Sequence, residues 1–517
     1  MPDPSATDPA GPAPAGPAPA GSHPSSRRRP PARWSLPDQP SLERLRKQAK
    51  QLRRAAAAGD SNARELIAAY DPGPGDVPLA RAQRVLARAY GFSGWSHLRS
   101  HLDVLAAWTR EMDDVDADDD PVDAFLRLAC LSYTAPYAAD DARVRLQGDP
   151  SLADSTPGTM AACGRAEQLA ELLDRDPRAV SRETGPHRWP PLLYLCYSRL
   201  DLGDPIATLR ALLDAGADPD SGFLWHGLPS PFTALTGVLG GGERDEPPHR
   251  QAVTMATMLL DAGADPNDNQ AFYNRQFRPD DSHLAPLLGH GAGRPHPSPW
   301  RDRLGAAYPS PTQMVGEHLR SAAEKGFTAR VETLLAHRVD PNTRGYHPIL
   351  GDATAYEIAV RNGHTAAASL LAEAGGRSDR IEDIDRVIGA ALAGEPAIGA
   401  APVGEPIPAE LPDSPAGLVA RRPDAMRLAG EQHDVAALGR LLDLGYDVDA
   451  AGPNGRTALH EAALRGGGEM VRWLIDHGAD PARKECDFGA TAAGWAAHAG
   501  HRDLAAWLDR LAGERRV

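Results

Sequence analysis

Two histidines four residues apart have a spacing that suits metal chemistry. His97 and His101 would lie on one face of a helix, one turn apart, as many zinc ligands do. No third ligand can be named, because the four cysteines form no CxxC pair and no HExxH motif occurs. We therefore interpret both histidines as exposed residues beside Trp95 and predict no metal site.

Motifs for nucleotide binding and for nucleophilic catalysis are absent from the sequence. No glycine-rich loop ends in GKS or GKT, and no GxSxG turn occurs. The acidic run DDVDADDD at 113–120 resembles the start of a calcium loop. Asp119, however, stands where that loop needs glycine, and Phe125 stands where it needs a bidentate glutamate. The sequence predicts no catalytic residue, no cofactor and no enzymatic activity.

The most regularly placed carboxylates belong to a recurring segment. Asp218, Asp265 and Asp480 end the same pattern of paired aliphatics, two residues, glycine and one further residue. Paired aliphatics close a helix against a neighbour, and glycine adopts the left-handed backbone that ends it. The following Asp-Pro starts an extended turn. These aspartates therefore need no acid–base role. The copies are LLDAGADPD (212–220), LLDAGADPN (259–267) and LIDHGADPA (474–482), with variants LLDLGYDVD (441–449) and LLAHRVDPN (334–342).

A second recurring segment opens each unit. It reads NGRTALHEAALRGG at 454–467 and FGATAAGWAAHAGH at 488–501. The glycine makes a turn, and Thr457 or Thr491 is in position to cap the helix that follows. Small alanines such as Ala462 let that helix pack closely against its neighbours.

Together the two segments resemble the ankyrin repeat. GRTALHEAALRGGGEMVRWLIDHGADP matches that motif at nearly every defining position, although Ala458 replaces the usual proline and Gly467 a common histidine. The resemblance implies an all-α fold, a solenoid of stacked helix-turn-helix units, preceded by an N-terminal helical module. The arrangement also resembles a group of bacterial ankyrin proteins whose N-terminal module carries an LRKQAK helix and an ARAYGFSGW-like turn.

Composition and periodicity divide the chain into six expected segments. Pro, Ala, Gly and Ser dominate the start, apolar residues recur at helical spacing in the next segment, and the repeats follow. The sequence does not say whether the repeats form one continuous array or two. The segments are a disordered Pro/Ala-rich tail (1–40), an N-terminal helical module (41–110), an acidic linker (111–121), ankyrin-like repeats with insertions (122–380), a degenerate repeat or loop (381–420) and C-terminal ankyrin repeats (421–517).

Similar ankyrin arrays bind other proteins with the concave side formed by inner helices and turn tips. Aromatic and arginine side chains at turns are therefore the candidate contacts. They occur in SGFLWHGL (221–228), in NQAFYNRQF (269–277) and in a third turn. An enlarged turn can instead fold back and bury its own aromatics, and this alternative stays open. The predicted partner-binding residues are Phe223, Trp225, His226, Phe272, Tyr273, Arg275, Arg344 and Tyr346.

Charge is distributed unevenly along the chain. Residues 1–110 hold 16 Lys and Arg against 9 Asp and Glu, a net +7, while the remainder holds 39 against 61, a net −22. A basic N-terminal module with Arg81, Arg84, Arg88 and Arg99 suggests an alternative function as a nucleic-acid-associated regulator. A third alternative is an enzyme with its site in the irregular region 221–310.

The expected location is the cytoplasm, and the expected partner is another protein of unknown identity. No run of about 18 uncharged apolar residues occurs, so we predict no membrane contact. The N-terminus lacks the apolar core of a signal peptide.

Overall fold

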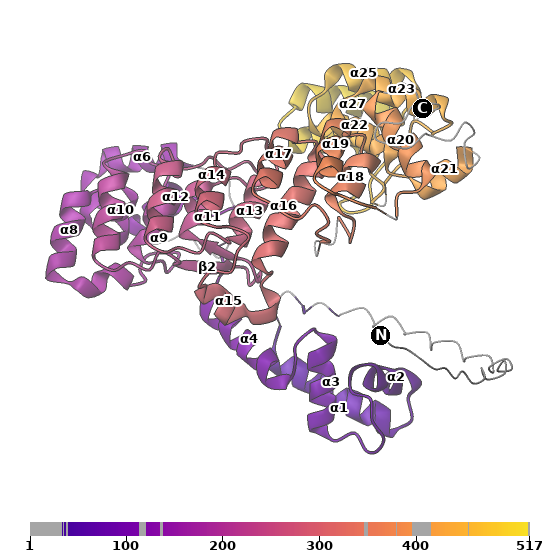
Figure 1. Cartoon of the computed structure of the whole chain (residues 1–517). Helices are drawn as coiled ribbons and strands as arrows, with labels where there is room; N and C mark the ends of the chain where they lie inside the picture. The colour runs from indigo at the N-terminus through magenta and orange to yellow at the C-terminus, as the bar shows by residue number, and fades with distance from the viewer. Residues whose placement is uncertain are drawn as a thin grey trace, which may run out of the picture. The chain divides into compact units, whose positions relative to one another are not determined.

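The computed structural model describes residues 34, 36–37, 40–112, 120–134, 138–345, 350–378, 380–394, 415–452 and 454–514 (Figure 1). Most of the predicted Pro/Ala-rich tail and of the acidic linker therefore lies outside the described residues. The chain divides into two compact units, Met1–Leu102 and Asp103–Val517. We call them unit 1 and unit 2 and describe each by itself.

Unit 1 is a small helical module. It contains α1 (Leu42–Ala57), α2 (Ser61–Tyr70), α3 (Leu79–Ala89) and the first part of α4 (Trp95–Trp108). Helix α1 packs against α2 and α3, because Leu45 and Ala49 recur on one face and are buried.

Unit 2 consists of short helices joined by turns. Its helices are α5 (Pro121–Ala129), α6 (Ala139–Gly148), α7 (Pro157–Ala162), α8 (Ala166–Arg175), α9 (Pro191–Tyr197), α10 (Pro205–Asp214), α11 (Ala234–Leu239), α12 (Ala252–Asp261), α13 (Asn269–Arg275), α14 (Leu284–Gly289), α15 (Pro299–Leu304), α16 (Pro311–Lys325), α17 (Thr328–Ala336), α18 (Ala355–Arg361), α19 (Thr365–Glu373), α20 (Asp383–Ala393), α21 (Pro415–Arg421), α22 (Ala425–Gln432), α23 (Val435–Asp443), α24 (Ala458–Leu464), α25 (Gly468–Asp476), α26 (Ala492–His498) and α27 (Arg502–Glu514). Single 3-10 turns cover Pro150–Asp154, Pro177–Ser181 and Gly305–Ala307.

Helices pair into hairpins, and the first helices of successive hairpins contact one another. Thus α22 packs against its partner α23 and against α24, which packs against α25 and α26. The same order continues backwards from α22 through α20 and α18 to α16. The prediction of a helical solenoid of stacked units is confirmed.

Local sequence sets where each hairpin begins and ends. Thr457 caps α24 by sharing hydrogen bonds with His460 three residues later, and Thr354 caps α18 with Glu357 in the same way. The predicted helix-closing glycines have a left-handed backbone, with φ of 91° at Gly445. In the variant segment 334–342, Arg338 occupies the glycine position and adopts a φ of 61°.

A three-stranded sheet interrupts the helical fold of unit 2. It contains β1 (Thr109–Arg110), β2 (Gly222–Trp225) and β3 (Pro231–Thr233). Strand β1 pairs in parallel with β2, and β2 pairs antiparallel with β3. The sheet forms because the enlarged turn after α10 carries aromatic residues that favour extended pairing.

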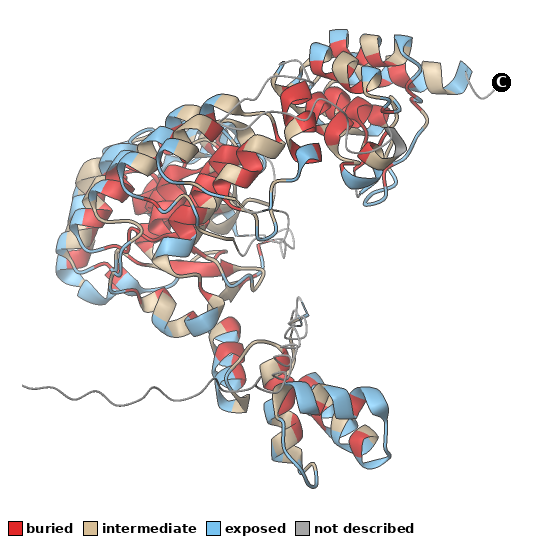
Figure 2. Ribbon diagram, turned by 45° about the vertical axis from the view of Figure 1, so that its right-hand side comes forward, coloured by how far each residue is buried: buried red, intermediate tan, exposed pale blue. Residues whose placement is uncertain are grey.

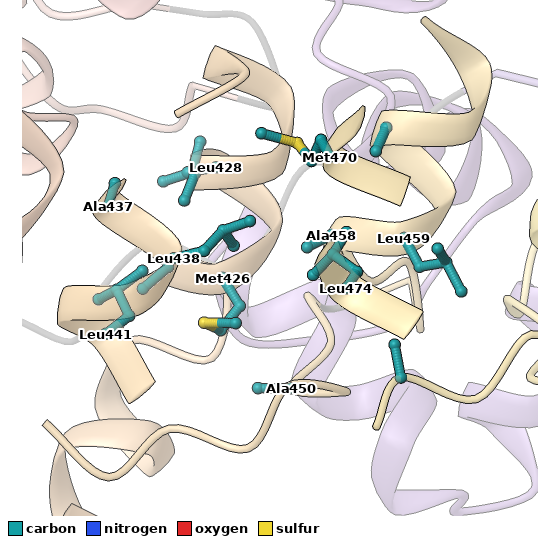
Figure 3. Packing of buried hydrophobic residues seen from close by; sticks show 14 of the residues in the cluster. Met426, Leu428, Ala437, Leu438, Leu441, Ala450, Ala458, Leu459, Met470 and Leu474 are labelled. Atoms are coloured by element: carbon teal, nitrogen blue, oxygen red, sulfur yellow. The ribbon is translucent and has the colours of Figure 1, made fainter. Parts of the chain in front are cut away.

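The core of unit 2 lies between the helices. Figure 2 shows buried residues on the faces that helices turn toward one another, with exposed residues on the outside. In the C-terminal repeats, Leu438 and Leu441 of α23 are fully buried in one cluster with Leu459 of α24 and Leu474 of α25 (Figure 3). Burial of such side chains is the main source of stability in a repeat array.

Residues 381–420, expected as a degenerate repeat or a loop, include helix α20. This helix packs closely against α18, because Gly389 has no side chain. A Cβ atom on Gly389 would lie 2.1 Å from the carbonyl oxygen of Val360. Within the described residues, no helix has both the length and the apolar character needed to cross a bilayer.

Two glycine-to-alanine substitutions should therefore change stability in opposite directions. Gly389→Ala should lower the free energy of unfolding by roughly 1–3 kcal/mol, because α18 and α20 must move apart. Gly439 of α23 has open space around its Cβ position, so Gly439→Ala should raise that free energy by up to about 1 kcal/mol. Urea unfolding followed by circular dichroism measures both. Equal effects would contradict the close packing of α18 and α20.

Candidate partner-binding face

The first predicted cluster is split between core and surface. Phe223 is 1% exposed and packs against Trp189, with ring centroids 5.0 Å apart, and against Phe232 at 5.7 Å. A partner of the folded array cannot contact it. Phe223 therefore belongs to the core, as in the alternative in which the turn buries its own aromatics.

Trp225 and His226 of that cluster remain partly accessible. The Trp225 indole N–H donates to the carbonyl of Ser132 at 3.1 Å, which fixes the ring at the sheet. His226 has a left-handed backbone, and its Nδ1 lies 2.7 Å from a carboxylate oxygen of Glu111.

The second predicted cluster lies on helix α13 rather than in a turn. The carboxylate of Asp268 caps this helix by accepting the amide N–H of Ala271 at 2.9 Å. Phe272 is 3% exposed, and Arg275 is 6% exposed. Only Tyr273 is partly accessible, with its hydroxyl 2.8 Å from a carboxylate oxygen of Glu243.

Phe272 packs against a buried histidine pair. The Nε2 atoms of His283 and His318 lie 3.0 Å apart, and burial holds the pKa of both well below the ordinary value. When both rings are neutral, the Nε2–H of one can donate a hydrogen bond to the Nε2 of the other at this distance. The pair therefore links the start of α14 to α16.

The third cluster is only partly described. Arg344 forms an ion pair with Glu357 at 3.3 Å, and Glu357 is fully buried. Tyr346 lies outside the described residues. Arg344 remains partly exposed and lies in the connection between α17 and α18.

The two histidines considered for metal chemistry differ from each other. The Nδ1 atom of His97 lies 2.8 Å from the Ser93 hydroxyl, and His97 is exposed. His101 was expected to be exposed, but it is 6% exposed and packs against Phe92. Among the residues that the structure describes, no three His, Cys, Asp or Glu side chains group in a way that suits a metal ion.

A row of side chains crosses the last three hairpins at intervals of 34 residues. They are Arg427, the third residue of α22, and Glu461 and Trp495, the fourth residues of α24 and α26. The Arg427 guanidinium lies 3.3 Å from the Glu461 carboxylate. Arg456, in the turn before α24, lies 3.0 Å from the other oxygen of Glu461 and 4.5 Å above the Trp495 ring. We call these four side chains the ladder.

The ladder ends at an exposed aromatic residue. Phe488 is 78% exposed and contacts Trp495 edge-on, with ring centroids 5.8 Å apart. The buried carboxylate of Glu485 accepts the amide N–H groups of Asp487, Phe488 and Ala490, so the turn that carries Phe488 is fixed. The side-chain amide of Asn454 donates a hydrogen bond to the Asp487 carboxylate at 2.7 Å, which ties this turn to the preceding one. The result is a rigid, exposed aromatic surface.

Comparison with known proteins identifies the family. The family model of ankyrin repeats in three copies matches residues 426–511. The Notch-regulated ankyrin repeat-containing protein of Homo sapiens is 33% identical over 85 residues, which are 16% of this chain and 74% of that protein. This chain belongs to the ankyrin-repeat family.

Two other relatives show how little of the chain such matches cover. The Notch-regulated ankyrin repeat-containing protein B of Danio rerio is 32% identical over 85 residues, which are 16% of this chain and 76% of that protein. Potassium channel AKT3 of Oryza sativa subsp. japonica is 42% identical over 79 residues, which are 15% of this chain and 9% of the channel. The match therefore spans only a small part of the channel.

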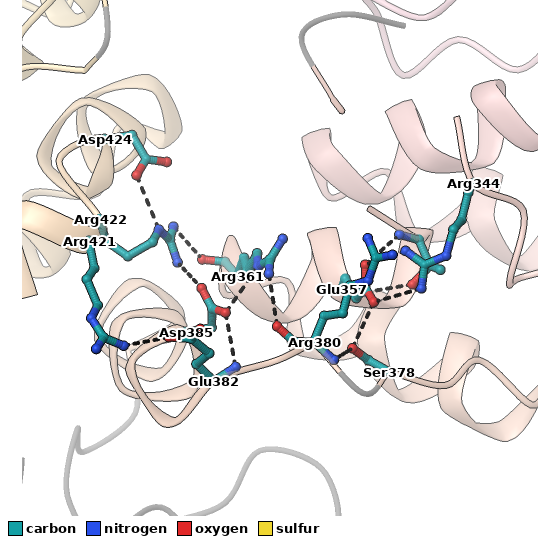
Figure 4. A network of polar contacts seen from close by, with 11 residues as sticks. Arg344, Glu357, Arg361, Ser378, Arg380, Glu382, Asp385, Arg421, Arg422 and Asp424 are labelled. Carbon is teal, nitrogen blue, oxygen red and sulfur yellow. Dashed lines mark hydrogen bonds and ion pairs between the residues drawn. The ribbon is translucent and has the colours of Figure 1, made fainter. Parts of the chain in front are cut away.

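The ankyrin hairpins are linked across residues 381–424 by ion pairs around a cavity of about 640 Å³ (Figure 4). Arg422 donates to Asp385 and Asp424 at 3.2 Å and to the carbonyl of Arg361 at 3.1 Å. Arg421 donates to Glu382 at 2.7 Å. Three arginines and three carboxylates line the cavity, so its charges balance. These ion pairs and hydrogen bonds link α18, α20 and α22.

Sequence reasoning missed the ladder and Phe488. The signal was present, because Trp495 stands where the preceding ankyrin repeat has Glu461, and Phe488 precedes the turn glycine. Which turn aromatics stay exposed depends on contacts between residues far apart in the chain, and the repeat motif does not encode them.

Ion pairs around Glu431 stabilise the start of the ladder at Arg427. Burial opposes ionisation of Glu431, but Arg427, Lys325 and Arg465 outweigh it and hold the pKa of Glu431 below its ordinary value of 4.5. Its carboxylate lies 2.9 Å from Arg427 and 3.4 Å from Arg465. A carboxylate whose pKa falls on folding adds stability above its unfolded pKa, and this stability is lost as the pH falls through the folded value.

Glu431→Gln should therefore lower the free energy of unfolding by roughly 1 kcal/mol near pH 7, and this loss should shrink as the pH falls below the ordinary value of 4.5. Urea unfolding across this pH range measures the difference. Glu469→Gln is the matched control, because Glu469 is exposed and forms no ion pair among the described residues. A loss that stays constant with pH would contradict the electrostatic account.

Proposed function

We propose that this chain is a non-enzymatic scaffold that binds another protein through the concave face and turn tips of its ankyrin array. Ankyrin repeats are generally protein–protein interaction modules. The observation that carries the proposal is Phe488, which is 78% exposed and held at the end of the ladder by a fixed turn. Large aromatic side chains at such positions supply binding energy at low entropic cost.

The surroundings of Phe488 support this role. Arg456 stacks on Trp495 from the side of the preceding turn, so the two rings and the guanidinium form one surface. Most exposed large apolar side chains occur singly and need no explanation, but an aromatic pair beside a stacked arginine resembles the centre of a protein interface.

The accessible residues of the earlier prediction form a second proposed contact. Trp225, His226, Tyr273 and Arg344 retain partial exposure, whereas Phe223, Phe272 and Arg275 support the core behind them. A partner long enough to follow the array contacts both surfaces.

Removal of the exposed aromatic should weaken partner binding. Full-length chain captures its partner from a lysate, mass spectrometry identifies it, and calorimetry with the purified partner gives affinities. Phe488→Ala should lower the affinity at least about 10-fold, which is about 1.4 kcal/mol. The control is Trp473→Ala, since Trp473 lies on α25, outside the ladder, and stacks on His477. Equal losses for the two variants would argue against this face.

The second contact is tested with the same partner. The double substitution His226→Ala and Tyr273→Ala should lower the affinity by a factor of about 5–10, because two rim side chains each contribute modestly. Val253→Ala on α12, where Val253 is 45% exposed, is the control. Unchanged affinity in the double variant would restrict the binding face to the C-terminal repeats.

A further inference from the structure

Helix α1 of unit 1 carries a strongly basic surface that the proposed scaffold function does not use. Five of its exposed cations lie on one face, and we call them the basic stripe: Arg46, Lys47, Lys50, Arg53 and Arg54. Their spacing at positions i, i+1, i+4, i+7 and i+8 places them on one face over about two helical turns. The opposite face, with Leu45, Ala49 and Ala56, is buried in the module.

The described part of the chain provides the stripe with few ion pairs. Lys47 pairs with Glu43 at 3.0 Å, and both side chains are more than two-thirds exposed. Among the described residues, the four other members of the stripe form no ion pair. An exposed pair of this kind is weak and is easily exchanged for another anion.

Three of the four arginines chosen from the sequence form ion pairs within the module, which corrects that choice of cations, while Arg99 is exposed. Arg84 and Arg88 contact the Asp71 carboxylate at 2.7 and 3.2 Å, and Arg81 lies 3.4 Å from it. Arg81 also donates to the carbonyl of Gly73 at 2.6 Å. These three arginines hold the loop between α2 and α3. Arg64 and Arg99 are exposed singly on α2 and α4, so the cations that are exposed as a group in the described part of this unit lie on α1.

We propose that the basic stripe binds the phosphate backbone of double-stranded nucleic acid without reading its sequence. Five long cationic side chains over about 12 Å of helix give about one positive charge per 2.4 Å. This approaches the charge density of a duplex, which carries one phosphate per about 1.7 Å of axis. Backbone contacts by Lys and Arg fix position without carrying sequence information.

Two other polyanions fit the stripe less well. Single strands are usually held by aromatic side chains that stack on bases, and the stripe contains none. A helix that binds an acidic membrane inserts an apolar face, but the apolar face of α1 is already buried against α2 and α3. A duplex backbone needs neither feature.

Fluorescence anisotropy with the full-length chain and a labelled mixed-sequence DNA duplex of about 20 base pairs tests the proposal. Binding should weaken with salt, with a slope of log K against log salt of about −4 to −5 for five phosphate contacts. Absence of binding at about 50 mM salt, or a strong preference for one sequence, would overturn it.

Charge reversal locates the site. Lys50→Glu with Arg53→Glu should lower the affinity at least about 10-fold and reduce the magnitude of the salt slope by about 2. The matched control is Arg64→Glu with Arg99→Glu, which makes the same charge change at exposed positions of unit 1 outside the stripe. Circular dichroism verifies that both variants fold.

Two outcomes would refute the stripe. One is an equal loss of affinity in both charge-reversed variants, which would mean that net charge alone drives binding. The other is binding of the unmodified chain to phosphatidylserine-containing vesicles with no binding to the duplex, which would assign the stripe to a membrane surface.

Discussion

Burial of one hairpin against the next is the interaction on which this protein depends. A single hairpin has apolar side chains on faces that only a neighbour can cover. Leu438 and Leu441 of α23 lie in one cluster with Leu459 of α24 and Leu474 of α25. Stability is therefore a sum over adjacent interfaces rather than the property of one central core. The close helix contacts at residues such as Gly389 follow from the same requirement.

Once the interfaces are fixed, the solvent-facing positions are free to specialise. Phe488 is such a position, and it is held by amide bonds to Glu485 and by a ladder whose ion pairs centre on the buried Glu461. Irregular hairpins require other support. Arg320 and Arg330 are fully buried there and donate to backbone carbonyls, for example those of Gly351 and Arg275. Buried arginines thus satisfy turns whose sequences depart from the repeat.

The sequence predicted the helices and the array, because glycine-closed helices and threonine caps are local signals. It failed where the outcome depended on distant residues. Asn269–Arg275 was expected as a turn, yet Asp268 caps it as a helix and is itself held by hydroxyl groups of β3 and α11. Burial raises the pKa of that carboxyl to about 6. The burial of Phe223 likewise depends on Trp189, and no local pattern separates it from the exposed Phe488.

Amide hydrogen exchange in a Leu438→Ala variant tests the stacking account most directly. Leu438 is fully buried in α23, so its truncation weakens the interfaces of that hairpin and leaves distant ones intact. The account predicts faster exchange in α22–α25, with unchanged protection in α7–α12. An equal loss of protection across all helices of unit 2 would show a single cooperative core and would contradict it.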